Sequence, residues 1–341
     1  MTEFIRSFDA PSVDLSGKSI LVTGGTGSFG RAFVRHVLEH HSPKKLIVFS
    51  RDEQKHFEMA QEFDAVKYSC MRYFIGDVRD YSRLEMAMRD VDIVVHAAAM
   101  KHVPAAEYNP FECIRTNVNG AENLVRAALA NRVSKVIALS TDKACSPINL
   151  YGASKLASDK IFVSANNLSG ELDTRFSVVR YGNVIGSNGS VLPFFQKIIA
   201  SGADYLPITD PRMTRFWITL SQGVSFVLSS LSMMRGGEIF IPKIPSMKVT
   251  DLARYLAPSL PIKVVGIRPG EKLHEAMSTE DDSRNMMELN DRYVIEPELV
   301  FWNSRHSYSN VGRRVDEGFS YVSNMNTEWL DDQTLDELLK K

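Results

Sequence analysis

Four side chains that can give or accept protons lie within residues 140–155. Asp142 and Lys143 directly follow an apolar run that is typical of a buried strand. Tyr151 and Lys155 open the helical pattern that comes next, and residues four apart lie on one face of a helix. A lysine ammonium stabilises a phenolate, so we expect the Tyr151 pKa to fall toward the range of a useful base. The stretch predicts an acid–base site, although it also fits solvated charges at a strand end followed by a helix with a surface lysine.

A glycine-rich loop near the N-terminus predicts a site for a dinucleotide. Residues 18–23 are apolar like a buried strand, the glycines follow at residues 24–30, and a helical pattern occupies residues 31–40. Glycines let the backbone approach a pyrophosphate, which then rests on the N–H groups of the helix start. A plain glycine turn is the alternative, but the strand before the loop and the helix after it favour a cofactor site. The residues expected to contact the cofactor here are Gly24, Thr26, Gly27, Ser28, Phe29 and Gly30.

The end of the second predicted strand, at residues 45–50, bears on the choice between NAD and NADP. About 20 residues after the glycines, an NAD site usually has an acidic residue for the ribose 2′-hydroxyl. Here the strand ends at Ser50 and Arg51, and an arginine can pair with a 2′-phosphate. We therefore predict NADP, with Ser50, Arg51 and Lys55 at this end of the cofactor. The alternative places Asp52 on the ribose of NAD and Arg51 in solvent.

Four more apolar runs, at residues 73–77, 92–100, 135–139 and 176–180, alternate with helical patterns such as residues 110–131. This alternation predicts an α/β fold with a doubly wound parallel sheet. Ligands bind at the carboxyl ends of such strands, so we place Asp77, Val78 and Ala98 near the cofactor. His96 lies inside an apolar run and is expected to be a packed core histidine.

After residue 183 the alternation of strand and helix stops. We predict a Rossmann domain at residues 15–182 and a smaller, mainly substrate-binding domain at 183–341, some of whose segments return to the sheet. A helix is expected at residues 191–199, and the tail is expected to hold one strand at 292–295 and a final helix near 330–339. Arginines suit a diphosphate, although a single arginine is more often a surface charge. The predicted substrate-binding residues are Lys101, Thr141, Asn183, Arg215, Arg268 and Glu271.

Composition excludes several classes of protein. The chain has 341 residues and a net charge of −1, which gives no sign of binding to nucleic acid or to an anionic membrane surface. No apolar run approaches the ~20 residues of a membrane span, and the polar N-terminus lacks the core of a signal peptide. The three cysteines have no metal-ligand spacing, so no metal site is predicted. We expect a cytoplasmic protein with reduced thiols.

The glycine loop together with Tyr151 and Lys155 resembles the extended short-chain dehydrogenases/reductases. Asp142 after a threonine resembles the nucleotide-sugar 4,6-dehydratases, and the pair with Lys143 closely resembles their inverting UDP-N-acetylglucosamine group. That group opens the pseudaminic acid pathway, which serves glycosylation of bacterial flagellins and other surface structures. Related membrane-anchored enzymes carry methionine in place of Tyr151. The resemblance rests on residues 101–104, 142–143, 149–155, 213–217 and 268–275.

The resemblance implies NADP as cofactor, UDP-N-acetylglucosamine as substrate and a homo-oligomer, either a hexamer or a dimer. It implies that Tyr151 takes the C-4 hydroxyl proton and that Lys155 assists it and holds the nicotinamide ribose. Lys143 would be the C-5 base, with a pKa lowered by burial and neighbouring cations, and Asp142 would enter protonated as the acid for the C-6 hydroxyl. Inversion at C-5 comes from the resemblance. A nucleotide-sugar 4-epimerase and a non-catalytic dinucleotide sensor are the alternatives, and neither would need all four residues.

Overall fold

The structure is a computed structural model that describes residues 5–187, 190–298 and 307–339. Its largest element within these residues is a sheet of ten strands in the order β15-β13-β14-β10-β6-β5-β4-β1-β2-β3. The strands are β1 (Ser19–Thr23), β2 (Lys45–Ser50), β3 (Met71–Ile75), β4 (Ile93–His96), β5 (Lys135–Thr141), β6 (Arg175–Tyr181), β10 (Ile239–Pro242), β13 (Met286–Glu288), β14 (Arg292–Ile295) and β15 (Arg313–Arg314).

The first six strands and β10 pair in parallel, which confirms the predicted doubly wound parallel sheet. The tail differs from the prediction of a single strand. β14 pairs antiparallel with β10, and β13 and β15 extend this edge by antiparallel pairing. The two added strands are only three and two residues long, too short to show an apolar alternation, although Met286 and Met287 of β13 are buried in the main core.

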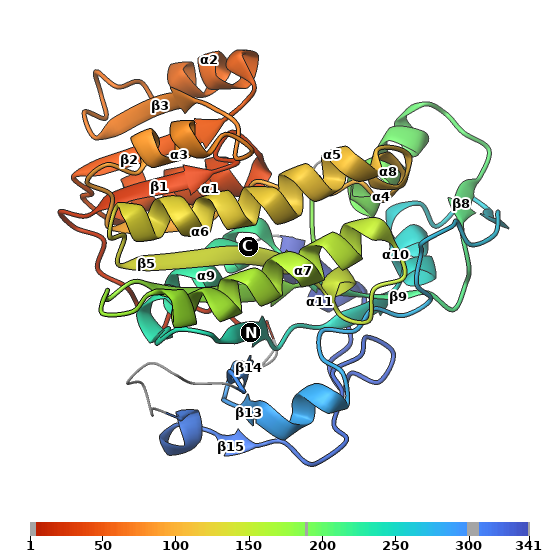
Figure 1. Ribbon diagram of the computed structural model, residues 1–341. Coiled ribbons are helices and arrows are strands. Elements are labelled where there is room, and N and C mark those ends of the chain that lie inside the picture. The colour runs from red at the N-terminus through yellow and green to blue at the C-terminus, as the bar shows by residue number, and fades with distance from the viewer. Residues whose placement is uncertain (1–4, 188–189, 299–306, 340–341) are drawn as a thin grey trace.

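Helices cover both faces of the sheet (Figure 1). α3, α6 and α7 pack on one face and α1 and α9 on the other. The helices are α1 (Ser28–His40), α2 (Glu53–Glu62), α3 (Tyr81–Ala87), α4 (Val103–Tyr108), α5 (Pro110–Ile114), α6 (Gly120–Ala130), α7 (Leu150–Ala165), α8 (Val191–Ala200), α9 (Leu220–Met233), α10 (Val249–Leu256) and α11 (Asp332–Leu339). The predicted helix at 110–131 is helical throughout residues 110–130, but it contains a π-helical turn at Arg115–Asn119 between α5 and α6.

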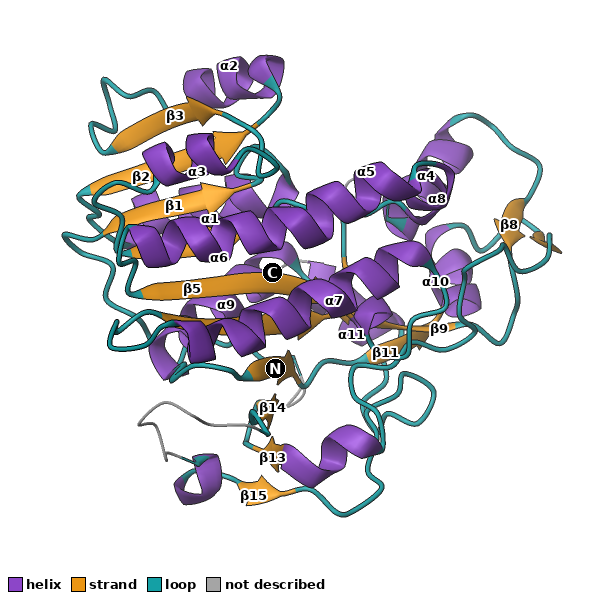
Figure 2. Cartoon of the chain, in the orientation of Figure 1, coloured by secondary structure: helices purple, strands orange, loops and turns teal. Residues whose placement is uncertain are grey.

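The segments after residue 183 build a second layer of structure beyond the carboxyl ends of the parallel strands (Figure 2). Two small sheets lie there, formed by β7 (Asn183–Val184), β9 (Thr214–Ile218) and β11 (Ser246–Lys248), and by β8 (Leu206–Ile208) and β12 (Ile262–Val264). A separate apolar cluster that includes Phe195, Trp217 and Leu335 supports them. The same half of the chain also returns β10, β13, β14 and β15 to the main sheet. The domain boundary near residue 183 stays a prediction.

No helix in the described ranges is both long and apolar enough to cross a bilayer. The inner parallel strands are mostly apolar, and helices bury them on both faces. The sheet therefore serves as a rigid platform whose carboxyl edge faces the second layer.

Candidate active site

The catalytic turn, which we define as residues 141–143, begins where β5 ends. The Thr141 hydroxyl accepts a hydrogen bond from the Lys143 N–H (3.3 Å) and donates one to Asp142 Oδ1 (3.0 Å). Helix α7 packs directly against this turn. A Cβ on Gly152 would lie 2.1 Å from the Lys143 carbonyl oxygen, so only glycine permits this approach. The close packing places Tyr151 beside the turn, as the sequence predicts.

Asp142 and Lys143 form an ion pair, with Lys143 Nζ 3.0 Å from Asp142 Oδ1 and the Lys143 side chain 25% exposed. Asp142 is fully buried, and its Oδ2 has no hydrogen-bond partner. Burial raises the pKa of Asp142, the Lys143 charge partly offsets this effect, and the Glu275 charge adds to it. A raised pKa is what an acid needs if it is to enter a reaction protonated.

The expectation of a lowered pKa for Lys143 is wrong for this structure. Burial does lower it, but the carboxylates of Asp142 and Glu275 outweigh burial, so the Lys143 pKa is raised. Arg215, the neighbouring cation, acts in the expected direction but is too weak to reverse the balance. Lys143 is therefore an ammonium while both carboxylates are charged.

Tyr151 also departs from the expected pKa. Burial raises the pKa of Tyr151 to about 12, and the cation that lowers it is Lys143, with help from a hydrogen bond to Thr141. Lys155 lies one turn further along α7 and is itself buried, which lowers its own pKa. The phenol is therefore protonated at neutral pH in the protein alone, because no cation compensates fully for burial.

Polar contacts hold the start of α7 in place. The Asn149 side chain caps the helix by accepting from the Gly152 N–H (2.7 Å) and donates to the Gly270 carbonyl (2.8 Å). Asn117, in the π-helical turn, donates to Ser154 Oγ (2.9 Å) and accepts from the Met100 N–H (2.8 Å). Sequence reasoning placed Asn117 in a helix but assigned it no role, and its polar neighbours Arg115, Thr116 and Asn119 give no signal that sets it apart.

A buried network lies behind the catalytic turn. Asp159 accepts a hydrogen bond from Ser140 Oγ (2.7 Å) and pairs with Arg180 (3.2 Å). Arg180 also donates to the Met277 carbonyl (2.9 Å). These contacts join β5, α7, β6 and the segment after residue 268. His96, predicted to be a core residue, is buried and hydrogen-bonds the Thr23 hydroxyl (2.7 Å).

Glu275 was missed by sequence reasoning, which chose Glu271 from the same charged segment. Glu275 is 2% exposed, and its Oε1 lies 3.5 Å from Lys143 Nζ. Arg215, predicted to bind a diphosphate, lies 3.8 Å from the same oxygen and donates to the carbonyls of Lys272 (3.0 Å) and Leu273 (3.1 Å). In this structure the Arg215 guanidinium thus holds the segment that carries Glu275, and its role toward substrate stays a prediction.

The other predicted substrate residues spread around the turn. Asn183 Oδ1 lies 3.5 Å from Lys143 Nζ. Arg268 is exposed, and its N–H donates to the Glu271 carboxylate (3.2 Å). Lys101 follows β4 and is exposed, and partial desolvation of its side chain lowers its pKa. Only Asn183 among these four is in direct contact with the catalytic lysine by a described hydrogen bond.

The glycine loop fits a dinucleotide. Gly24 has φ +65°, and a Cβ there would lie 2.8 Å from the Ala98 backbone nitrogen. A Cβ on Gly30 would lie 2.3 Å from the Gly25 carbonyl oxygen. Gly27 precedes α1 and gives the helix no side-chain cap, so the first N–H groups, beginning at Ser28, are suited to a phosphate. Phe29 stacks on Phe33 and anchors the helix start on the core.

The side chains at the end of β2 bear on whether Arg51 would meet the 2′-phosphate of NADP or Asp52 would meet the ribose of NAD. The Asp52 side chain caps α2 by accepting from the Lys55 N–H (3.0 Å) and pairs with the Lys55 ammonium (3.2 Å). The Arg51 side chain is 62% exposed and lies 3.7 Å from Asp77. The Ser50 hydroxyl contacts that of Thr26 at 2.9 Å. The Asp52 carboxylate thus serves as the cap of α2, while the Arg51 side chain remains at the surface. Val78 is buried nearby.

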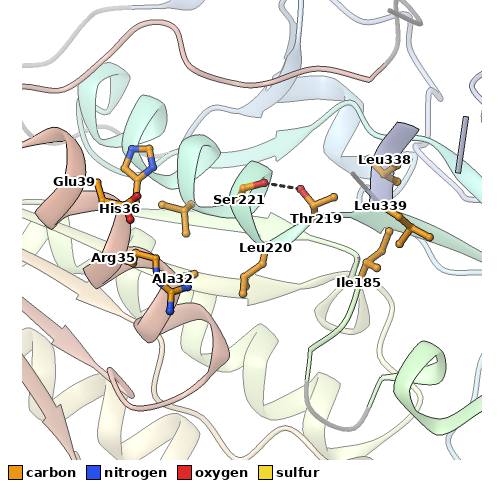
Figure 3. A pocket seen from close by; sticks show the side chains of 11 residues that line it. Ala32, Arg35, His36, Glu39, Ile185, Thr219, Leu220, Ser221, Leu338 and Leu339 are labelled. Atoms are coloured by element: carbon orange, nitrogen blue, oxygen red, sulfur yellow. Dashed lines mark hydrogen bonds between the residues drawn. The ribbon is translucent and has the colours of Figure 1, made fainter. Parts of the chain in front are cut away.

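A cavity of about 350 Å³ lies elsewhere, between α1, α9 and α11 (Figure 3). Its walls include His36, Leu220 and Leu338, and none of the predicted site residues lines it. The acid–base constellation is therefore at the carboxyl edge of the sheet and not in this cavity. Among the residues that the structure describes, no group of three His, Cys, Asp or Glu side chains is arranged to hold a metal ion.

Nucleotide-sugar dehydratases and epimerases are similar to this chain. The family model described as "Polysaccharide biosynthesis protein" matches residues 20–297. A Campylobacter jejuni protein named UDP-N-acetylglucosamine 4,6-dehydratase (inverting) is 59% identical over 94% of this chain and 97% of its own length. A UDP-glucose 4-epimerase of Rickettsia canadensis is 40% identical over 82% of each chain. The structure of DesIV, a dTDP-glucose 4,6-dehydratase of Streptomyces venezuelae with NAD bound, has a TM-score of 0.65 and 27% identity over 75% of this chain and 86% of that chain.

The extent of these matches exceeds what a shared cofactor loop would produce. They span the glycine loop, the catalytic turn, α7 and the segment that carries Glu275. The chain therefore belongs to the polysaccharide biosynthesis protein family of extended short-chain dehydrogenases/reductases, in the group that holds the inverting UDP-N-acetylglucosamine 4,6-dehydratases.

Proposed function

We propose that the protein removes water from UDP-N-acetylglucosamine across C-5 and C-6, through a C-4 ketone, with inversion at C-5. The observation that carries this proposal is the Asp142–Lys143 pair, 3.0 Å apart, which acts electrostatically on the neighbouring Tyr151. An acid and a base side by side suit an elimination, in which one proton leaves carbon and another goes to the departing oxygen.

The chain's own residues move three protons in this scheme. Tyr151 takes the C-4 hydroxyl proton, Lys143 Nζ takes the C-5 proton, and Asp142 gives its proton to the C-6 oxygen as water leaves. The reactive form of the pair, a neutral amine beside a protonated acid, differs from the observed ion pair by one proton moved across the 3.0 Å hydrogen bond. A nicotinamide dinucleotide, when bound, would store the hydride of C-4 and return it to C-6, so no net oxidation would occur. C-5 regains a proton in the same reduction, and its addition from the opposite face gives the inversion.

NADP is the form of cofactor that we propose. Asp52 is committed to capping α2, and Arg51 lies at the strand end with an exposed guanidinium that can pair with a 2′-phosphate. Lys155 is proposed to hold the nicotinamide ribose. We also propose a cytoplasmic homo-oligomer that acts at the start of pseudaminic acid synthesis, in keeping with the family resemblance.

A 4-epimerase is the second candidate, because a UDP-glucose 4-epimerase is 40% identical to this chain. Epimerisation would use the glycine loop, Tyr151 and Lys155 for the same C-4 ketone. Epimerisation would give the Asp142–Lys143 pair no proton to transfer, since no bond at C-5 or C-6 changes. The pair therefore favours the dehydratase.

Proton NMR of the protein with UDP-N-acetylglucosamine in D2O, without added reductant, tests the proposal. We expect a 4-keto-6-deoxy sugar with deuterium at C-5 and the L-arabino configuration. The D-xylo product appearing first would contradict inversion, and UDP-N-acetylgalactosamine would establish the epimerase. An unchanged substrate in the presence of NADP would contradict both candidates.

A further inference from the structure

Glu275 brings a second buried carboxylate to the catalytic lysine. Its Oε1 lies 3.5 Å from Lys143 Nζ and 3.8 Å from Arg215 Nε, and its Oε2 lies 3.9 Å from Lys272 Nζ. Glu275 Oε2 is buried and has no hydrogen-bond partner. The carboxylate thus sits among three cations without a directional hydrogen bond to fix Oε2, which suits an electrostatic role more than a structural one.

The backbone around Glu275 is anchored independently of its side chain. The Glu275 N–H donates to Ser323 Oγ (3.0 Å), and its carbonyl accepts from the Ser323 N–H (2.8 Å). Arg215 holds the carbonyls of Lys272 and Leu273, and Lys272 Nζ donates to the Cys145 carbonyl. The segment would therefore keep its path if the Glu275 carboxylate were neutral.

The charged groups around Lys143 show which carboxylate can stabilise its ammonium during the reaction. Asp142, Tyr151, Glu275 and Arg215 act on the lysine ammonium, and Lys272 acts on Glu275 from the far side. In the proposed reaction Asp142 starts protonated, so it offers no negative charge when Lys143 begins to take a proton. Within the described part of the chain, Glu275 is then the remaining anion at ion-pair distance from the amine.

We propose that Glu275 is a positioning residue that stabilises the ammonium formed on Lys143 during the elimination. The C-5–H bond breaks and its proton goes to Lys143 Nζ, while its electron pair forms the C-5–C-6 double bond. The C-6–O bond breaks with its electron pair on oxygen, which takes the Asp142 proton and leaves as water. A preorganised carboxylate lowers the energy of the developing cation without reorganising during the step. This inference rests on the proposed dehydratase function.

The test compares Glu275→Gln with the wild-type protein and with Glu280→Gln, an exposed glutamate further along the same segment. We expect Glu275→Gln to slow water loss and C-5 exchange with D2O by about 100-fold, with little change in KM. Formation of enzyme-bound reduced nicotinamide, which reports C-4 oxidation and an intact fold, should remain. Glu280→Gln should match wild type.

The pH dependence of activity distinguishes an electrostatic role of Glu275 from a merely structural one, which would leave the profile unshifted. The Glu275 charge raises the pKa of both Asp142 and Lys143, so its neutralisation should shift both limbs of the activity profile to lower pH. Glu275→Asp, which keeps the charge, should fall between wild type and Glu275→Gln in rate and serves if the glutamine variant does not fold.

Two outcomes would overturn the role of Glu275: a wild-type rate and pH profile in Glu275→Gln, or an equal loss of C-4 oxidation and water loss in both Glu275 variants. Failure of the wild type and of Glu280→Gln to dehydrate UDP-N-acetylglucosamine would contradict the proposed function instead.

Discussion

The catalytic turn and the end of β2 both gather charged side chains, but they expose them very differently. Asp142 is fully buried and Glu275 is 2% exposed, whereas the side chains of Arg51 and Lys55 are 62% and 57% exposed. Buried charges act on one another through a weakly screening medium, so they shift pKa values strongly. Exposed charges are screened by water and salt, and each pair contributes about 0–1 kcal/mol. The comparison predicts that substitutions at the turn have large, specific effects and that substitutions at the end of β2 have small, salt-sensitive effects.

The largest effect is expected for Lys143→Met, which removes the amine but keeps an apolar stem. Water loss and C-5 exchange should fall by about 1,000-fold or more, because the proposed base is gone. Both are measured by NMR in D2O. Lys160→Met, at an exposed position of α7, is the control and should retain activity. Normal C-5 exchange in Lys143→Met would remove this lysine from the mechanism.

Tyr151→Phe should act one step earlier. Without the phenol, reduction of bound nicotinamide by the substrate should fall by about 100-fold or more, as measured by absorbance in a single turnover. Burial raises the pKa of Tyr151 to about 12, so the wild-type rate of this step should rise with pH as the phenolate forms. The control is Tyr181→Phe, which removes a buried neighbouring hydroxyl. A pH-independent step would show that the phenolate is not the acting species.

Arg180→Met tests the effect of a buried ion pair on the free energy of unfolding instead of on the reaction rate. The substitution leaves Asp159 buried without its partner, and breaking a buried pair in this way costs about 3–5 kcal/mol of unfolding free energy. Urea unfolding measures the change. Asp173→Asn is the matched control, because it breaks the ion pair of the 96% exposed Asp173 with Arg175 and should cost less than about 1 kcal/mol. Similar losses in the two variants would refute the contrast between buried and exposed charges.

The smallest effect is expected for Arg51→Ala. NADP binding should weaken by about 10-fold, since a charged hydrogen bond to the 2′-phosphate is lost, and NAD binding should stay nearly constant. Titration at low and high salt measures both, and the loss should shrink as salt rises. Equal weakening for NAD and NADP would contradict a role for Arg51 in recognising the phosphate.

Much of the fold could be predicted because its signals are local. Parallel strands are buried on both faces and therefore appear as apolar runs, and β1 with the glycines and α1 forms one continuous pattern. The π-helical turn at Arg115–Asn119 could not be predicted, because the contacts that stabilise it come from Ser154 and Met100. β13 and β15 were missed for a similar reason, since β13 depends on an edge supplied by β14, and β15 depends on an edge supplied by β13.

The sequence by itself determined which groups stand beside one another along the chain: the glycine loop, the acid–base pair at 142–143, and the Tyr151–Lys155 spacing on one helix. Only the tertiary structure decided their protonation, because that depends on burial and on charges distant in sequence. Glu275 lies far along the chain from Lys143, yet its carboxylate is 3.5 Å away and, together with the adjacent Asp142, it reverses the expected shift of the lysine pKa. Residue types set what chemistry is available, and packing sets the charge state in which it begins.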